Sequence, residues 1–173
     1  VNEAESAAKR LGFPVVLKID GDIIHKTKAG CVVIVKSKNH VKDVYNDIIR
    51  NAKKVTKNIY GVIVQRFAAG TEVMIGAKRD PQFGIVVLLG RGGTGVSKKD
   101  IVMRISPLKK QDIAEMMRES GIYKKLEKPE KLAELVFAAE RLMEKNPKIA
   151  EMDINPVMVS EHIVAADVRI IEG

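Results

Sequence analysis

Apolar residues recur along the chain with two periods, one typical of helices and the other of strands. Helical spacing predicts helices at 1–11, 109–120 and 130–145, and another that begins at Asn39, a residue type favoured at the N-cap position. The inward face expected for the last helix comprises Leu132, Leu135, Val136, Ala139 and Leu142. Apolar runs predict strands at 15–19, 30–35, 61–66, 72–79, 84–89 and 101–105. The mixture predicts an α/β protein.

Polar side chains alternate with apolar ones in a hairpin predicted over 149–170. The polar set is Glu151, Asp153 and Asn155, and the apolar set is Met152 and Ile154. Because side chains alternate between the faces of a strand, the polar set shares one face and the apolar set points into a core. Asp167 follows on the expected antiparallel partner. Oxygen ligands from two adjacent strands suit Mg²⁺. The alternative is an edge strand with a solvated acidic face.

The charge of the chain is unevenly distributed. The net charge is +8, and residues 1–60 carry 12 Lys and Arg against 6 Asp and Glu. A basic first lobe suits a polyanionic ligand bound together with a metal. The lysines are dispersed and only seven aromatic residues are present, which disfavours a nucleic-acid binder.

Several features bear on where the protein works. No apolar run has transmembrane length, and the single cysteine, Cys31, excludes an internal disulfide. We therefore expect a cytoplasmic protein without a membrane partner. The Lys- and Glu-rich composition without tryptophan favours a thermophilic source.

Two residues near the start of the chain are candidates for phosphate chemistry. Lys18 stands inside the strand predicted at 15–19, where a lysine either meets an anion or extends into solvent. The loop that follows carries His25, and a neutral imidazole can accept a phosphoryl group. An ordinary surface histidine is the alternative.

A glycine-rich loop, Gly90-Arg91-Gly92-Gly93-Thr94-Gly95, closes a predicted strand. Such loops let backbone N–H groups approach phosphate oxygens, although a surface loop without a ligand has the same composition. The spacing matches neither a Walker-A loop nor a dinucleotide-binding fingerprint. Arg104, at the end of the next strand, is a second candidate phosphate ligand or the partner of a surface ion pair.

Short motifs follow one another along the chain in a specific order. The first are Phe13-Pro14-Val15-Val16-Leu17-Lys18-Ile19, His25-Lys26-Thr27, Val64-Gln65-Arg66-Phe67, Gly70-Thr71-Glu72 and Arg79-Asp80-Pro81-Gln82-Phe83-Gly84. The later ones are Gly90-x-Gly92-Gly93, Arg104-x-x-Pro107-Leu108 and Glu151-x-Asp153-x-Asn155-Pro156, followed by Asp167. Together they resemble the ATP-grasp part of ADP-forming acyl-CoA synthetases, above all the nucleotide-binding β subunits of acetate–CoA ligases, which are relatives of succinyl-CoA synthetase.

The resemblance implies an ATP-grasp fold with two mixed α/β lobes, 1–60 and 61–173, and ATP or ADP bound between them. The implied nucleotide-binding residues are Lys18 for the phosphates, Gln65, Arg66 and Phe67 for adenine, and Glu72 for the ribose, with Gly92, Gly93 and Arg104 as further candidates. The implied Mg²⁺ ligands are Asp153, Asn155 and Asp167. His25 resembles the histidine that takes a phosphoryl group from the partner subunit and passes it to ADP.

The chain departs from the pattern of the family at four places. Lys28 and Gly30-Cys31 stand where an acidic residue and two glycines are usual. Residues 94–99 replace an apolar stretch with a glutamate, and a Gly-Arg-Gly loop is missing around 126–128. The sequence begins inside a predicted helix, so we expect the opening of the first lobe to be absent.

The reaction that the resemblance implies is acyl-CoA + ADP + phosphate ⇌ carboxylate + CoA + ATP. Because no segment resembles a CoA-binding domain, we expect a CoA-binding α subunit or a fused domain as partner. A succinyl-CoA synthetase β chain is a second possibility within the same fold. A non-catalytic nucleotide-sensing module is a third, although a sensor would need no phosphoryl acceptor such as His25.

Overall fold

The computed structural model describes residues 1–23, 25–93 and 100–173. The chain folds into two compact units, Val1–Phe67 and Ala68–Gly173. The division lies later than the boundary expected near residue 60, because the strand β3 (Ile59–Arg66) pairs along its length with β1 (Val15–Gly21) and so belongs to the first unit.

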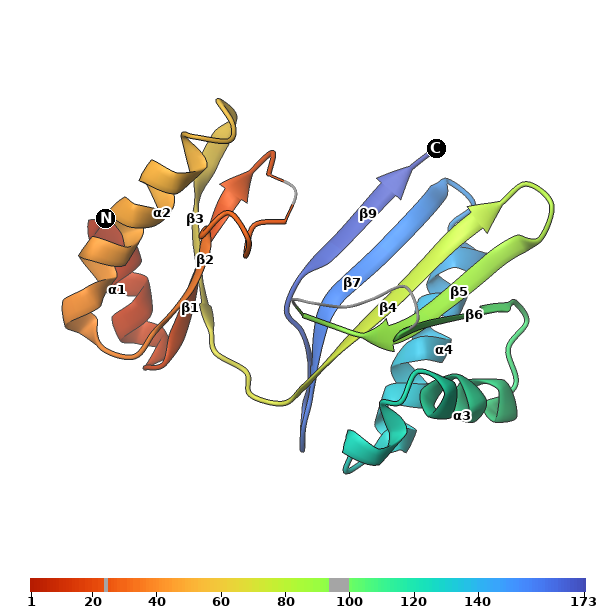
Figure 1. The fold of residues 1–173 in the computed structure, drawn as a ribbon. Helices are drawn as coiled ribbons and strands as arrows, with labels where there is room; N and C mark the ends of the chain where they lie inside the picture. The colour runs from red at the N-terminus through yellow and green to blue at the C-terminus, as the bar shows by residue number, and fades with distance from the viewer. Residues whose placement is uncertain (24, 94–99) are drawn as a thin grey trace. The chain divides into compact units, whose positions relative to one another are not determined.

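The first unit packs two helices on one face of a three-stranded sheet (Figure 1). Its further elements are α1 (Asn2–Leu11), β2 (Val32–Val35), the 3-10 turn η1 (Lys38–His40) and α2 (Val41–Ala52). The antiparallel order is β2-β1-β3. The expected N-cap at Asn39 is wrong, because that residue lies inside η1 and α2 begins only at Val41.

The second unit packs two helices against a six-stranded sheet, with strand order β6-β5-β4-β7-β8 and β9 beside β7 (Figure 1). The strands are β4 (Thr71–Asp80), β5 (Gly84–Arg91), β6 (Ile101–Ile105), β7 (Ile149–Val159), β8 (Ile163–Ala165) and β9 (Val168–Glu172). The helices are α3 (Lys110–Glu119) and α4 (Pro129–Lys145), and the 3-10 turn η3 (Tyr123–Lys125) lies between them in sequence. All strand pairs are antiparallel.

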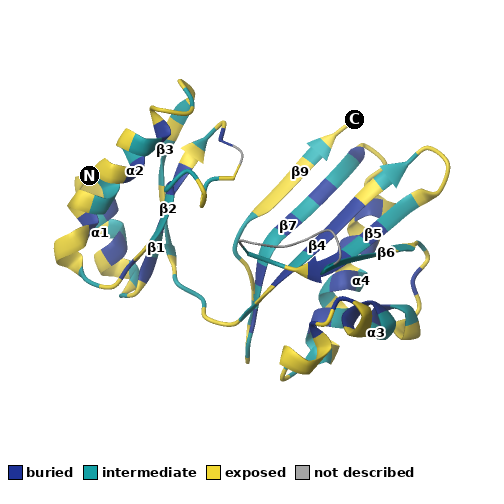
Figure 2. Ribbon diagram, in the orientation of Figure 1, coloured by how far each residue is buried: buried dark blue, intermediate teal, exposed yellow. Residues whose placement is uncertain are grey.

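Helix α4 contributes much of the second core (Figure 2). Its buried apolar residues are Leu132, Val136, Ala139 and Met143. Leu142 was expected to face inward, but it is 39% exposed. The stripe continues from Ala139 to Met143 in a step of four, which turns Leu142 towards solvent.

The Arg79-Asp80 motif builds the second unit rather than a ligand site. The Arg79 guanidinium donates to the carbonyl oxygens of Met143 at 2.6 Å and Ile149 at 3.2 Å, around the C-terminal end of α4. A cation there stabilises the helix dipole. Asp80 accepts hydrogen bonds from the N–H groups of Gln82 and Phe83, which lower the pKa of its carboxyl.

Among the described residues, no helix combines the length and the apolar character that crossing a membrane requires.

Candidate functional site

Lys18 lies on the face of the first sheet that the helices leave uncovered. Leu17 and Ile19 are fully buried against α1 and α2, so strand alternation directs Lys18 to the opposite face. There it pairs with Val32 on β2 and Ile63 on β3, and only 8% of it is exposed. A cation held at low exposure in the central strand is suitably placed for an anionic ligand.

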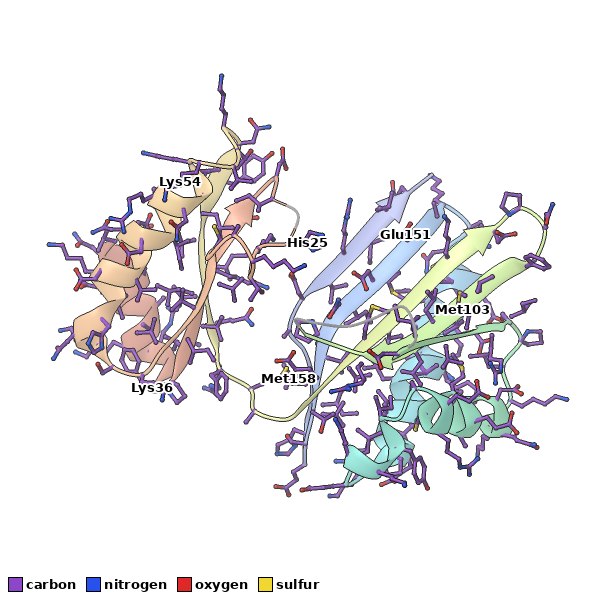
Figure 3. All side chains as sticks on the ribbon, in the orientation of Figure 1. His25, Lys36, Lys54, Met103, Glu151 and Met158 are labelled. Atoms are coloured by element: carbon purple, nitrogen blue, oxygen red, sulfur yellow. The ribbon has the colours of Figure 1, made fainter. Side chains whose placement is uncertain are left out.

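His25 begins a turn in the connection between β1 and β2. Its φ of 60° falls in the left-handed region, which is unfavourable for a residue with a side chain. Its carbonyl oxygen accepts the N–H of Ala29 at 3.2 Å. The residue is exposed on the side of the sheet away from α1 and α2 (Figure 3). A residue with a side chain in this backbone region is often found in functional segments, which agrees with the role expected for His25.

The end of β3 carries the three residues expected to meet adenine. Gln65 pairs with Val16, which places it on the same open face as Lys18. Arg66 pairs with Val15, so its side chain leaves from the other face, and it is exposed. Phe67 follows the strand and donates its N–H to the carbonyl oxygen of Pro14 at 3.2 Å. The structure therefore brings Gln65, but not Arg66, to the face of Lys18.

The acidic positions of β7 lie on the face of the second sheet that is opposite α3 and α4. Asp153 pairs with Gly76 on β4, and Gly76 in turn pairs with Leu88 on β5, so the three residues share this face. Met152 and Ile154, which alternate with the acidic positions, are 2% and 6% exposed in the core. The predicted division of this strand into a polar and a buried face is confirmed. Figure 3 marks Glu151 on the same strand.

Asp167 reaches this acidic face from the short link between β8 and β9. The N–H of Asn155 donates to the carbonyl oxygen of Asp167 at 3.1 Å, and the N–H of Ala166 donates to that of Pro156 at 2.9 Å. Burial raises the pKa of the Asp153 carboxyl, and the charges of Glu151 and Asp167 raise it further, against the opposing effect of Arg169. The structure thus places the backbone of Asp167 beside Asn155 and the charge of Asp167 close enough to act on Asp153.

The chemistry of this set fits a hard divalent cation. A bound cation would offset the repulsion that raises the pKa of Asp153. In the described part of the chain, no group of three or more His, Cys, Asp or Glu residues could hold a metal by itself. Two carboxylates and one amide are the partial set that Mg²⁺ uses when water and substrate phosphates supply its other ligands.

A cavity of about 300 Å³ opens beside Glu72. It is lined by Thr71, Glu72, Arg91, Gly92, Ile122 and Lys125. The N–H of Gly92 donates to the Glu72 carbonyl oxygen at 2.9 Å, and a Cβ added to Gly93 would overlap the Glu72 carboxylate. A side chain at position 93 would therefore displace the Glu72 carboxylate from the position that it occupies here. The loop residues Thr94 and Gly95, and the departure at 94–99, lie outside the described residues.

Lys125 was missed by sequence reasoning. It belongs to η3, which is fixed beside β4 by a hydrogen bond from the Thr71 hydroxyl to the Lys125 carbonyl oxygen at 3.1 Å. No local motif distinguishes Lys125 from its neighbour Lys124, so only tertiary packing could find it. A second cavity of about 330 Å³ is lined by residues including Arg79 and Pro147 and by none of the predicted site residues.

Arg104 is the candidate that the structure places elsewhere. It pairs with Val87, which is buried beneath the helices, so it leaves β6 from the face opposite to Asp153. Its guanidinium donates to the Glu119 carboxylate at 2.5 Å. The structure therefore favours the surface ion pair that the sequence allowed for Arg104, and not the phosphate ligand. The Arg104-x-x-Pro107-Leu108 motif is also held by buried Glu140, which accepts hydrogen bonds from the Ser106 hydroxyl and the Leu108 N–H. We assign this motif a structural role.

Comparison with known proteins gives the family of the chain. Residues 1–171 match the model of the ATP-grasp domain family. The chain is 39% identical to the β subunit of acetate–CoA ligase (ADP-forming) I from Pyrococcus furiosus, with 98% of this chain and 79% of that protein covered. The chain belongs to the ATP-grasp family. Several of its relatives are named as ADP-forming acetate–CoA ligases.

Solved structures support this ATP-grasp assignment. Acetyl-coenzyme A synthetase 1 of Ca. Korarchaeum cryptofilum, solved with coenzyme A and Ca-AMPCP, matches with a TM-score of 0.89 and 38% identity over 99% of this chain and 82% of that chain. Another structure of that protein contains Mg-AMPPCP and a phosphohistidine segment pointing towards the nucleotide site, and it has a TM-score of 0.80 at 37% identity over 99% of this chain and 82% of that one.

Some ATP-grasp relatives are much longer than this chain. Acetate–CoA ligase (ADP-forming) I from Archaeoglobus fulgidus is 36% identical over all of this chain, which spans 27% of the length of that protein. The chain thus corresponds to most of a separate β subunit and to about a quarter of a single-chain relative.

Proposed function

We propose that this chain is the ATP/ADP-binding part of an ADP-forming acyl-CoA synthetase, which converts acyl-CoA, ADP and phosphate to a carboxylate, CoA and ATP. The observation that carries the proposal is that the β8–β9 link brings Asp167 beside Asn155 and its charge near Asp153, in a chain that also presents His25 on an exposed, left-handed turn residue. The relatives named above supply the reaction class.

The two units would act as the two lobes of the ATP-grasp domain and would both contribute nucleotide ligands. Lys18 would bind phosphate oxygens, the 65–67 segment would meet adenine, and Glu72 would accept the ribose hydroxyls beside Gly92 and Gly93. Asp153, Asn155 and Asp167 would hold Mg²⁺, which when bound neutralises charge on the phosphates. We omit Arg104, since its guanidinium is engaged by Glu119.

His25 would carry the phosphoryl group. A P–N bond on the donor histidine of a partner breaks as a P–N bond to the His25 imidazole forms. In the second step this bond breaks as the β-phosphate oxygen of ADP attacks, which gives ATP and returns a free imidazole. Each transfer requires near in-line contact, so the carrier has to visit both sites.

The donor histidine would belong to a CoA-binding α subunit or a fused CoA-binding domain. Both arrangements occur among the relatives of this chain, which include a separate β subunit and a single-chain ligase. We place the enzyme in the cytoplasm, where the buried thiol of Cys31 stays reduced.

Phosphate labelling of the complete enzyme tests the proposal. We expect acid-labile label on this chain, and we expect His25→Ala to abolish both the label and net turnover while ADP still binds. His162→Ala, in the exposed turn before β8, is the matched control and should behave like the parent. Normal turnover of His25→Ala without label would refute the relay, and a parent complex with neither label nor turnover would instead indicate a nucleotide-sensing module.

A further inference from the structure

The His25 strap, defined as residues 25–31, is held by a polar anchor on its N-terminal side. Asp22 donates its N–H to the Asn58 carbonyl oxygen at 3.1 Å. Its carboxylate accepts the Asn58 side-chain amide at 2.9 Å and the Tyr60 hydroxyl at 3.3 Å. Gly21 permits this close approach, because a Cβ there would lie 2.6 Å from the Asn58 carbonyl oxygen. The start of β3 thus holds Asp22, which lies three residues before His25 in the sequence.

The opposite end of the strap is held in the core. Cys31 is fully buried, and its carbonyl oxygen accepts the N–H of Ile19 at 2.9 Å. Its thiol lies 3.9 Å from the carbonyl oxygen of Ile48 on α2. The side chain of Asn51, also on α2, donates to the Gly30 carbonyl oxygen at 3.2 Å.

The strap itself is a compact turn. The N–H of Cys31 donates to the Lys26 carbonyl oxygen at 2.9 Å, and that of Ala29 donates to the His25 carbonyl oxygen. Left-handed residues stand at its two sides, His25 with φ 60° and Gly30 with φ 67°. Because the turn satisfies its own hydrogen bonds, it can move as one body about these positions.

The two ends differ in their exposure to water. Asp22 and Asn58 are exposed and Tyr60 is 69% exposed, whereas Cys31 is 0% exposed. Water competes for exposed hydrogen bonds, so those of Asp22 break and re-form more readily than a buried contact. The Asp22 charge raises the pKa of the Tyr60 hydroxyl, which therefore keeps its proton as a donor at neutral pH.

We infer that Asp22 is a positioning residue whose contacts with Asn58 and Tyr60 form the releasable anchor of the His25 strap, while Cys31 is its fixed pivot. This inference rests on the proposed function, because a phosphoryl relay requires His25 to alternate between two sites. The anchor sets how often His25 leaves the position seen here.

Hydrogen exchange of the intact protein measures the anchor directly. Asp22→Ala should speed exchange of the amides of 25–31 by about tenfold, and Tyr60→Phe by a smaller factor, with the rest of the first unit unchanged. Asp22→Asn keeps an acceptor oxygen and should restore most of the protection. Asp43→Ala, on the exposed side of α2, and Tyr123→Phe, in the second unit, are controls that should match the parent.

Kinetics of the assembled enzyme supply the functional readout. Asp22→Ala should lower kcat several-fold and leave the KM for ADP unchanged, because no nucleotide ligand is removed. Unchanged exchange of the strap in Asp22→Ala, or equal acceleration throughout the first unit, would overturn the anchor. Faster exchange confined to the strap, in an enzyme whose His25 takes up no label, would uphold the anchor and refute the relay.

Discussion

At the scale of single residues, the surroundings of Asp153 affect both its pKa and the stability of the second unit. Its folded-state pKa is raised above the unfolded value by burial and then by Glu151 and Asp167. The folded state therefore binds a proton more tightly than the unfolded chain. The stability that protonated Asp153 contributes is fully present below the unfolded-state pKa, and it is lost as pH rises through the folded-state pKa. At neutral pH, ionised Asp153 lowers the stability of the second unit unless a cation is bound.

Replacing this charge should stabilise the metal-free protein. We expect Asp153→Asn to raise the thermal midpoint of the second unit by about 2 °C at pH 7 without Mg²⁺, and the gain should vanish at a pH low enough to protonate the parent. Calorimetry over a pH series measures this. Glu161→Gln, an exposed carboxylate in a turn, should show no such trend. A parent more stable than Asp153→Asn at pH 7 would contradict the electrostatic account.

Asp167 tests the metal assignment by itself. We expect Asp167→Ala to weaken Mg-ADP binding by about tenfold and to leave the affinity for ADP without Mg²⁺ unchanged, because one oxygen ligand is lost. Titration calorimetry with and without Mg²⁺ separates the two quantities, and Glu161→Ala serves as the control. Equal Mg-ADP affinity in variant and parent would show that the acidic face is only solvated.

At the scale of elements, the loop after β5 is shaped by the strand beside it. Gly93 has φ 86° and lies where any Cβ would meet the Glu72 carboxylate. Gly84, the first residue of β5, has a similar φ of 74° but no atom within 4 Å of an added Cβ. Both glycines have a positive φ, but only Gly93 has an acid, Glu72, beside it.

This difference permits a matched comparison. We expect both Gly93→Ala and Gly84→Ala to lose about 1–2 kcal/mol of unfolding free energy, because each forces a side chain into the left-handed region. Only Gly93→Ala should also weaken ADP binding, since it displaces Glu72. Denaturant unfolding and calorimetry measure the two effects. Equal ADP affinity in the two variants would remove Glu72 from the ribose site.

At the scale of the whole molecule, each unit has its own hydrophobic core and its own share of the predicted site. Lys18 and His25 belong to the first unit, and Glu72 with the acidic cluster belongs to the second. The chain covers 79% of a separate β subunit among its relatives, and the proposed function assigns CoA binding to a partner.

The purified chain should therefore bind ADP and Mg²⁺ without catalysing ATP synthesis from acyl-CoA. Addition of the CoA-binding partner should restore turnover, because the first acyl transfer and the donor histidine would be supplied there. A coupled assay for ATP measures this, with His25→Ala plus partner as the inactive control. Acyl-CoA-dependent ATP synthesis by the 173-residue chain alone would refute the division.

The sequence by itself determined the features that depend on local order along the chain. Strand alternation divided β7 correctly into Asp153 and Asn155 on one face and buried Met152 and Ile154 on the other, because the period of a strand is fixed by its backbone. The motif order likewise identified the ATP-grasp family, which the comparisons confirm.

Tertiary structure decided the contacts between segments far apart in sequence. The Arg104 guanidinium pairs with Glu119 because its side chain leaves β6 on the face that packs against α3, and Lys125 lines the cavity beside Glu72 because Thr71 holds η3 beside β4. The first unit extends to Phe67 because β3, which follows α2 in the sequence, pairs directly with β1. Pairing register and packing are properties of two segments together, so neither sequence segment specifies them alone.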